Sequence, residues 1–337
     1  MPQNFGFIPT VVSQQNAVEG SDGNVYCTVG GTLTQITPAG VETDFPSPGG
    51  NGGYEPWAIV VASDGSLWFG GYGVSYKYIF QCDTSGNVLN AFQTDTSSSE
   101  PLLIAGPGPY VYDTNLSGAF HQIPQIMQMD MNGNLNILVP PNTAWNTSPG
   151  ITLLGTDGTY LYLASLQSGV TTIYAMDEYG NFTVLNASAT FPNVTYGPWV
   201  FDGTHFWQAD GFRLYKMDTS GNFTGPISVS PTPAHSMGAY FCFDGTSLWF
   251  PYAAQTRVID YTPFPHYVTT YDGGVYEINL TTLVATQYDF GSLSQAQCAL
   301  NGPGGVWVTD NGWYNSLTGD QYRGLWVPGG SQIVMMP

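Results

Sequence analysis

An apolar run, an Asp-Gly pair and an aromatic strand recur along the chain. In one copy the apolar residues 57–61 lead into Asp64-Gly65, and Leu-Trp-Phe follows at 67–69. Apolar strands on both sides of an Asp-Gly pair predict a β-hairpin, because Asp starts the turn and Gly accepts a positive φ. Five clear copies and two degenerate ones are present, with turns at Asp22, Asp64, Gly108, Asp157, Asp202, Asp244 and Gly304.

A second turn pattern, Asp-x-x-Gly-Asn, alternates with the first. Clear copies begin at Asp83, Asp130, Asp177 and Asp218, and weaker forms occupy 36–41, 278–283 and 327–331. Each repeat therefore contains two hairpins, or four strands. The repeats lie about 42 to 50 residues apart, with one wider step before the last, which is the spacing of propeller blades. The sequence predicts an all-β fold, a seven-bladed β-propeller with four antiparallel strands per blade.

The repeats occupy nearly all of the 337 residues, which favours a single domain over 1–337. Residues 1–13 precede the first repeat and are predicted to be an N-terminal extension or an edge strand. Residues 7–12 could add such a strand or tie the ring shut. Residues 332–335 can supply the last outer strand, so the ring could close without exchange between the termini. Residues 255–270 are an insertion in blade six.

The charge balance narrows the possible partners. Only 9% of residues are charged, against about 25% in ordinary domains, and five Lys and Arg face 24 Asp and Glu, a net charge of −19. Such a base-poor surface does not suit nucleic acid or an anionic membrane. It must be built from amides, hydroxyls and tyrosines, which suits an extracellular or virion protein, or a protein exposed to acid.

The N-terminal residues lack a basic stretch and a long apolar segment, so no signal peptide is seen. The sequence contains no run of about 18 apolar residues, so it predicts no membrane-spanning helix. A protein with a surface of the extracellular type but no visible signal peptide is typical of a viral particle that is assembled inside a cell.

Four cysteines, Cys27, Cys82, Cys242 and Cys298, are far apart and show none of the spacings of a zinc site. Cys242 and Cys298 fall on the inner strands of the predicted blades six and seven. Two buried thiols are the favoured interpretation of this pair, and a disulfide is the alternative.

The two turn types lie on one face of the predicted ring, because strand direction alternates within each blade. The long, irregular connections lie on the opposite face, where a rigid scaffold usually carries its binding loops. Aromatic and imidazole groups in or beside those connections are the candidate binding residues, although several could instead fill the spaces between blades. They are Tyr54, Trp57, His121, Trp145, Trp199, Trp313 and Tyr314, with His235 beside them.

The first two repeats resemble the virginiamycin B lyase family, whose blades carry the phrase Gly-x-Asp-Gly-x-Leu-Trp-Phe-Thr-Glu. The matching residues are 20–28, Gly-Ser-Asp-Gly-Asn-Val-Tyr-Cys-Thr, with the continuation at 35–40 and 42–46. The resemblance implies a seven-bladed propeller. It also implies lyase activity that relies on Mg²⁺ and on a histidine with glutamates near the central channel.

Most of the family's catalytic positions are not matched. The last Glu of the phrase corresponds to Val29, Gly71, Asn115, Ser165, Asp210, Tyr252 and Asp310. Only Asp210 and Asp310 keep a carboxylate, and His235 is the plausible channel histidine. Because blade six lies between the two aspartates, we expect them to be too far apart to share a metal directly. These three residues are weak catalytic candidates, and no cofactor is expected; Mg²⁺ is the alternative.

Asn-x-Ser/Thr motifs are frequent. They occur at Asn115, Asn146, Asn181, Asn186, Asn193, Asn222 and Asn279. Glycosylation of a displayed surface would explain them, but a polar β-surface rich in Asn and Thr is the favoured interpretation.

Taken together, these patterns favour a non-enzymatic structural propeller, or one that binds a receptor or glycan, in a virion or another extracellular assembly. Its expected partners are other structural proteins of the assembly, or a surface glycan or receptor. The alternatives are a lyase of the virginiamycin B type that needs Mg²⁺, and a secreted carbohydrate-binding propeller.

Overall fold

The computed structural model describes residues 5–10, 17–29, 32–45, 56–72, 77–94, 103–115, 125–141, 150–167, 170–189, 199–238, 240–260, 266–291, 296–302, 304–310 and 323–328. Within these ranges the chain forms β-strands and no helix, which confirms the all-β prediction. No helix that could span a membrane occurs in them.

The strands form seven four-stranded antiparallel sheets, six of which use four consecutive strands. Blade one contains β2 (Ala17–Glu19), β3 (Val25–Val29), β4 (Thr32–Ile36) and β5 (Glu42–Phe45). Blade two contains β6 (Pro56–Val61), β7 (Leu67–Tyr72), β8 (Lys77–Cys82) and β9 (Val88–Thr94). Blade three contains β10 (Ile104–Ala105), β11 (Tyr110–Asn115), β12 (Gln125–Asp130) and β13 (Leu135–Leu138).

The second half of the chain continues the series. Blade four contains β14 (Gly150–Thr156), β15 (Leu161–Gln167), β16 (Val170–Met176) and β17 (Phe182–Ala189). Blade five contains β18 (Val200–Phe201), β19 (His205–Asp210), β20 (Arg213–Asp218) and β21 (Phe223–Ile227). Blade six contains β22 (Cys242–Phe243), β23 (Ser247–Asp260), β24 (His266–Asn279) and β25 (Val284–Gly291). The last sheet combines β26 (Ala296–Gly302), β27 (Gly305–Asp310) and β28 (Arg323–Pro328) with β1 (Phe5–Thr10).

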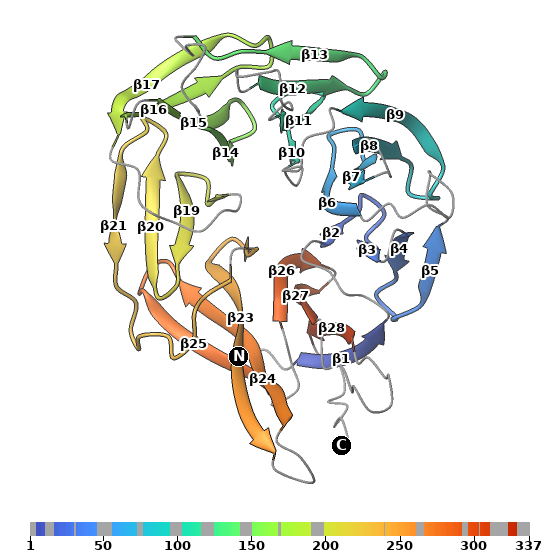
Figure 1. Ribbon diagram of the computed structural model, residues 1–337, viewed down its shortest axis with the longest axis vertical. Coiled ribbons are helices and arrows are strands. Elements are labelled where there is room, and N and C mark those ends of the chain that lie inside the picture. Colours follow the sequence, from blue (N-terminus) through green and yellow to red (C-terminus); the bar gives the residue numbers. More distant parts are fainter. Residues whose placement is uncertain are drawn as a thin grey trace.

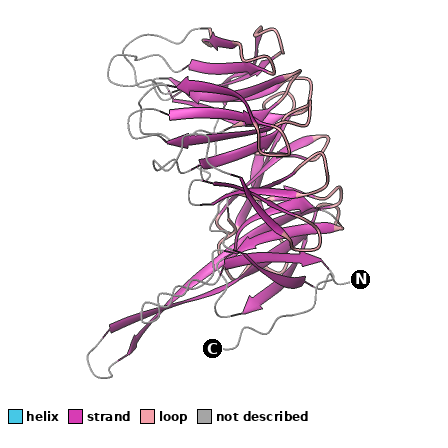
Figure 2. Cartoon of the chain, turned by 90° about the vertical axis from the view of Figure 1, so that its right-hand side faces the viewer, coloured by secondary structure: helices cyan, strands magenta, loops and turns pink. Residues whose placement is uncertain are grey.

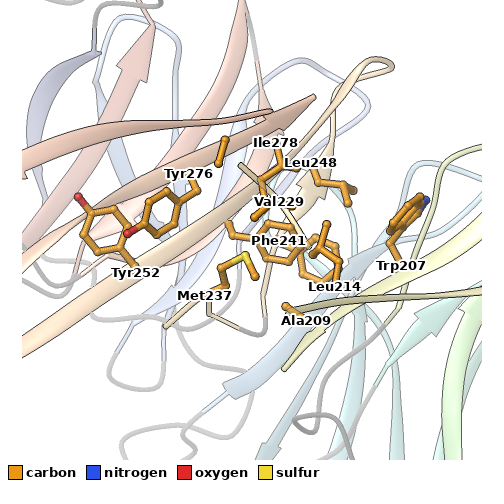
Figure 3. Close-up of a cluster of buried hydrophobic side chains, with 12 residues drawn as sticks. Trp207, Ala209, Leu214, Val229, Met237, Phe241, Leu248, Tyr252, Tyr276 and Ile278 are labelled. Atoms are coloured by element: carbon orange, nitrogen blue, oxygen red, sulfur yellow. The ribbon is translucent and has the colours of Figure 1, made fainter. Parts of the chain in front are cut away.

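The sheets stand around a ring, with the first strand of each blade near the centre and the last at the rim (Figure 1). A cluster of buried apolar side chains fills the space between each sheet and the next, so the core is divided into seven parts. The cluster between blades five and six contains Trp207, Leu214, Phe241 and Leu248 (Figure 3). Large aromatic side chains suit these spaces because each buries much apolar area. The predicted propeller of four-stranded antiparallel blades is therefore confirmed.

The Asp-Gly turns do more than reverse the chain. In blade five, one oxygen of the Asp202 carboxylate accepts the backbone N–H groups of Thr204 and His205, both at 2.7 Å. The other oxygen accepts the indole N–H of Trp207 at 2.6 Å. Asp244 and Trp249 repeat the arrangement in blade six at 2.8 Å. The turn aspartate thus fixes the aromatic side chain that enters the core, which explains why the two recur together.

Removal of this carboxylate charge should weaken the fold in a pH-dependent way. Burial opposes ionisation of Asp202, but the bonds from Trp207, His205 and Thr204 outweigh it and hold the carboxyl pKa below its ordinary value. A lowered folded-state pKa adds stability above the unfolded pKa, and this stability is lost as pH falls through the folded value. We expect Asp202→Asn to cost about 1 kcal/mol at pH 7, allowing for partial solvent exposure, and the difference from wild type to shrink as pH falls through the lowered folded-state pKa of Asp202.

Chemical denaturation of both proteins across this pH range measures the effect. Glu19→Gln, which removes an exposed carboxylate of β2, is the control and should cost little at any pH. A constant difference between Asp202→Asn and wild type down to the lowest pH would contradict the assigned role of the charge.

The Asp-x-x-Gly-Asn turns share one hydrogen-bond pattern. In the Asp177 copy, one carboxylate oxygen accepts the backbone N–H groups of Tyr179 and Asn181 at 3.0 and 2.9 Å. The other oxygen accepts the Asn181 side-chain amide at 2.9 Å, and this amide is the first cause of the lowered pKa of Asp177. Asn222 donates to Asp218 in the same way. The amide nitrogens of two Asn-x-Thr motifs are therefore committed to turns.

The N-terminal strand closes the ring. Strand β1 pairs antiparallel with β28 from Phe5↔Pro328 to Thr10↔Arg323, as the outermost strand of the last sheet. Of the two predicted roles for residues 1–13, the edge strand is therefore the correct one. The expectation that the ring closes without exchange between the termini is wrong, because this sheet joins both ends of the chain. The proposed outer strand at 332–335 lies outside the described residues.

Blade six carries a long β-ribbon where the sequence indicated an insertion at 255–270. Its two middle strands pair continuously from Ser247↔Asn279 to Asp260↔His266. The neighbouring strands are shorter, since β22 pairs with β23 only up to Trp249 and β25 pairs with β24 only from Gly273 onward. Beyond the pair Ala253↔Gly273 the two strands leave the ring as a ribbon, which projects away from the side that carries the short turns (Figure 2).

The cysteines are buried free thiols. None of the four forms a disulfide, so the favoured interpretation of Cys242 and Cys298 as two buried thiols is confirmed. Burial raises the pKa of Cys298 to about 12, and burial likewise raises the pKa of Cys82 to about 12. Thiolates are the reactive form, so these side chains are inert core residues at neutral pH.

Candidate functional site

One of the predicted binding aromatics belongs to the core. Trp199 is only 4% exposed and lies in the cluster between blades four and five, with an edge-on contact to Phe223 at 5.6 Å. Its backbone N–H donates to the carbonyl of Leu154 at 2.6 Å, which ties the connection before β18 to blade four. The prediction that Trp199 contacts a ligand is therefore wrong, because an inter-blade space requires a large apolar side chain here.

The other predicted binding residues are not placed by the structure. Trp57 lies in β6, but its side chain is outside the described part of the chain. The remaining members of the set also lie outside it: Tyr54, His121, Trp145, Trp313 and Tyr314. Their proposed binding roles stay predictions.

Asp210 and His235 are brought to one region at the border of blades five and six. Asp210 ends β19 and lies opposite Arg213 across a tight turn. His235 lies in the connection from β21 to β22, and this connection is held to the turn by a bond from the backbone N–H of Met237 to the carbonyl of Gly211, at 2.8 Å. Asp310 lies on β27 of the last sheet, and its side chain is not described.

The ring of His235 contacts an aromatic side chain. The imidazole stacks on Tyr252 with ring centroids 5.0 Å apart and an angle of 13° between the planes. The backbone N–H of His235 donates to the hydroxyl of Tyr276 at 2.9 Å. Figure 3 places Tyr252 and Tyr276 together at one end of the core cluster, with their rings close to each other.

The Tyr252 hydroxyl belongs to a polar network that sequence reasoning missed. It donates to the carboxylate of Asp289 on the outer strand β25. The side-chain amide of Gln287 donates to the same hydroxyl at 3.0 Å and to the Asp289 carboxylate at 2.6 Å. Burial is the first cause, and the Asp289 bond the second, of a pKa of Tyr252 well above its ordinary value. The group is thus a neutral hydrogen-bonding phenol at physiological pH, not a nucleophile.

The network depends on a glycine. A Cβ on Gly274 would come within 2.6 Å of the Tyr252 hydroxyl and would clash with the backbone carbonyl of Tyr288. Only a residue without a side chain permits Tyr252 to reach the outer strand. Tyr252 occupies the phrase-final position where the resembling family has Glu, so this position was the available sequence signal.

The arrangement suits binding better than acid–base chemistry. His235 is half-buried, and within the described ranges its ring nitrogens make no hydrogen bond. A general base needs a partner that orients it and a proton within hydrogen-bond reach. The described partner of the ring is the face of a neutral phenol, which holds the imidazole in place.

The donors described at this border do not make a Mg²⁺ site by themselves. This ion requires near-octahedral oxygen coordination, usually with one or two carboxylates. The described side chains contain no group of three His, Cys, Asp or Glu that could hold a metal. In blade six the position of the family's glutamate is taken by Tyr252, whose hydroxyl is already engaged by Asp289. We therefore derive no catalytic step through a metal.

Comparison with known proteins gives similarity of fold. No family model and no curated protein matches the chain. Among solved structures, a streptogramin B lyase superposes with a TM-score of 0.65 at 16% identity, over 97% of this chain and 98% of that one. Virginiamycin B lyase from Staphylococcus aureus gives a TM-score of 0.60 at 17% identity, over 96% and 100%.

The same lyase is also represented by a catalytically inactive histidine-to-alanine variant with quinupristin, at a TM-score of 0.58 and 18% identity, over 96% and 100% of the two chains. Identities this low establish the fold and leave the activity open. Over nearly its whole length, the chain is therefore similar in fold to the streptogramin and virginiamycin B lyases.

Proposed function

We propose that this protein is a non-enzymatic binding propeller, a structural component of a virion or another extracellular assembly. The ring is the rigid platform, and the face opposite the short turns is the contact surface. The partners are other structural proteins of the assembly.

The observation that carries this proposal is the ribbon of β23 and β24. A two-stranded hairpin is marginally stable by itself in water, and long exposed strand edges are usually avoided because they pair with other chains. A ribbon that projects from the ring is therefore best explained as an element that meets a partner (Figure 2).

Composition supports contacts that do not depend on charge. Five basic residues in 337 offer few salt bridges, whereas 22 tyrosines offer apolar area and a hydrogen-bonding tip. The same base-poor, polar composition supports an extracellular or virion location. The lyase alternative has no support from the described side chains. Around Asp210 they supply no set of ligands for a metal, and the ring of His235 stacks on Tyr252 without a described hydrogen-bond partner that would orient it as a base.

Attachment to the assembly should resist salt and depend on the ribbon. Charge pairs are screened over about 3 Å at 1 M salt, but apolar and amide contacts are not. We expect the protein to sediment with its particle or surface layer equally well from low salt to about 1 M. Replacement of residues 254–272 by Asn-Gly should abolish this co-sedimentation, because it removes the ribbon.

The shortened protein is designed to keep its fold. Ala253 and Gly273 are paired, so a two-residue turn joins them without disturbing the four-stranded part of blade six. Its thermal unfolding should stay close to that of wild type. Release of wild type by salt alone, or undiminished attachment of the shortened protein, would contradict the proposal.

A further inference from the structure

One edge of β24 is unpaired over part of its length, within the described part of the chain. Strand β24 starts at His266, and its pairing with β25 begins at Gly273. The seven residues between these limits are paired with β23 on one side. On the other side, within the described part of the chain, no strand is paired with them. This stretch reads His-Tyr-Val-Thr-Thr-Tyr-Asp from 266 to 272.

Two copies of one strand can pair antiparallel only about a two-fold axis perpendicular to the sheet. Such an axis keeps each side chain on its face, and directly opposed residues share a face. Opposed positions must therefore have the same parity, so the axis passes through a residue. The axis through Thr269 is the one that pairs all seven residues of the free stretch.

In that register the opposed residues are complementary. His266 lies opposite Asp272, Tyr267 opposite Tyr271, and Val268 opposite Thr270, with each of these pairs formed twice. Imidazole–carboxylate, aromatic and β-branched pairs are the cross-strand combinations that stabilise antiparallel sheets. The edge of β23, from Ala253 to Asp260, gives no comparable set of opposite-charge pairs in any such register.

We propose that β24 pairs with β24 of a second copy of this chain about an axis through Thr269. The pairing merges two two-stranded ribbons into one four-stranded sheet, and three or more strands are what a sheet needs for stability of its own. The inference rests on the proposed function in one respect, since it names a second copy as an occupant of the ribbon's edge.

The contact joins two short strand edges, so it buries less surface area than the roughly 1,000 Å² of a stable interface. The dimer is therefore weak in dilute solution and reinforced where copies are concentrated in an assembly.

A cysteine at the axis traps such a weak dimer. Opposed Cα atoms of an antiparallel pair are about 4.5–5.5 Å apart, within the range that a disulfide spans. We expect Thr269→Cys in the purified full-length protein to form a disulfide-linked dimer under mild oxidation, on a non-reducing gel. The native thiols are buried and add little background.

Thr256→Cys is the matched control. Thr256 of β23 lies opposite Thr270 of β24, and in the proposed sheet its two copies are about 16 Å apart, beyond the reach of a disulfide. It should stay monomeric under the same oxidation. Failure of Thr269→Cys to dimerise with unchanged thermal unfolding, or equal dimerisation of both variants, would overturn the proposal.

Charge exchange tests the register. In the Thr269→Cys background, Asp272→His opposes two imidazoles and should slow dimer formation roughly 5-fold. Addition of His266→Asp restores opposite partners and should restore the rate. A rate unchanged by the first substitution, or not recovered by the second, would exclude this register. Attachment to the assembly is measured separately, so self-pairing can fail while the proposed function stands, and the reverse.

Discussion

Removal of residues 1–12 is expected to lower the thermal unfolding midpoint by roughly 10 °C and to make the protein prone to aggregation. The deletion takes away β1 and its ladder with β28, which runs over six residue pairs. At about 1 kcal/mol net for each backbone hydrogen bond, the lost pairing amounts to roughly 5 kcal/mol. It also leaves β28 as an open edge. Calorimetry and light scattering measure the two effects.

A chain that begins at Phe5 is the control, because it retains all of β1. It should unfold within about 2 °C of wild type, which corresponds to less than 1 kcal/mol. Similar midpoints for both deletions and wild type would mean that β1 contributes nothing to ring closure.

Gly274→Ala is expected to destabilise the protein by about 3 kcal/mol or more. Its new methyl group would collide with the carbonyl of Tyr288 and crowd the Tyr252 hydroxyl. A backbone carbonyl cannot rotate away as a flexible side chain can, so the outer strand β25 must shift. The shift breaks the bond between Tyr252 and Asp289. Denaturant unfolding followed by fluorescence gives the free energy change.

Gly203→Ala separates this clash from the general effect of removing a glycine. Gly203 has a φ of +96°, and no atom lies within 4 Å of the point that a Cβ would occupy, so alanine there meets only backbone strain. That strain costs about 1–2 kcal/mol. If Gly274→Ala is no more destabilising than Gly203→Ala, the claim that Gly274 is closely packed against Tyr288 and Tyr252 is wrong.

Local turn chemistry is the part of the fold that the sequence predicts well. Asp202, Asp244 and Asp177 accept hydrogen bonds from residues two to five positions further along the chain, so one repeat is enough to predict their role. The position of β1 is different. The open edge that it covers belongs to β28, more than 300 residues further along the chain. Nothing in residues 5–10 specifies that partner, so an extension and an edge strand both fitted the sequence.

The candidate site was less predictable for a related reason. Trp199 stands in a connection between blades, where exposure is the usual expectation, but its burial is decided by Phe223 and by the neighbouring blade. Tyr252 reads as an ordinary strand residue. Its network with Asp289 and Gln287 is visible only once β25 lies beside β24. In both cases the decisive neighbour comes from another strand.

The order of strands around the ring has a consequence for synthesis. Six sheets consist of consecutive strands, so each can form as soon as its own four strands have left the ribosome. Strand β1 emerges first, yet its partner β28 follows more than 300 residues later. At about 5–20 residues per second, β1 waits roughly 15–60 s with its edge unpaired. Completion of the ring is therefore the last event of folding, and a ribosome that stalls before β28 leaves a propeller that cannot close.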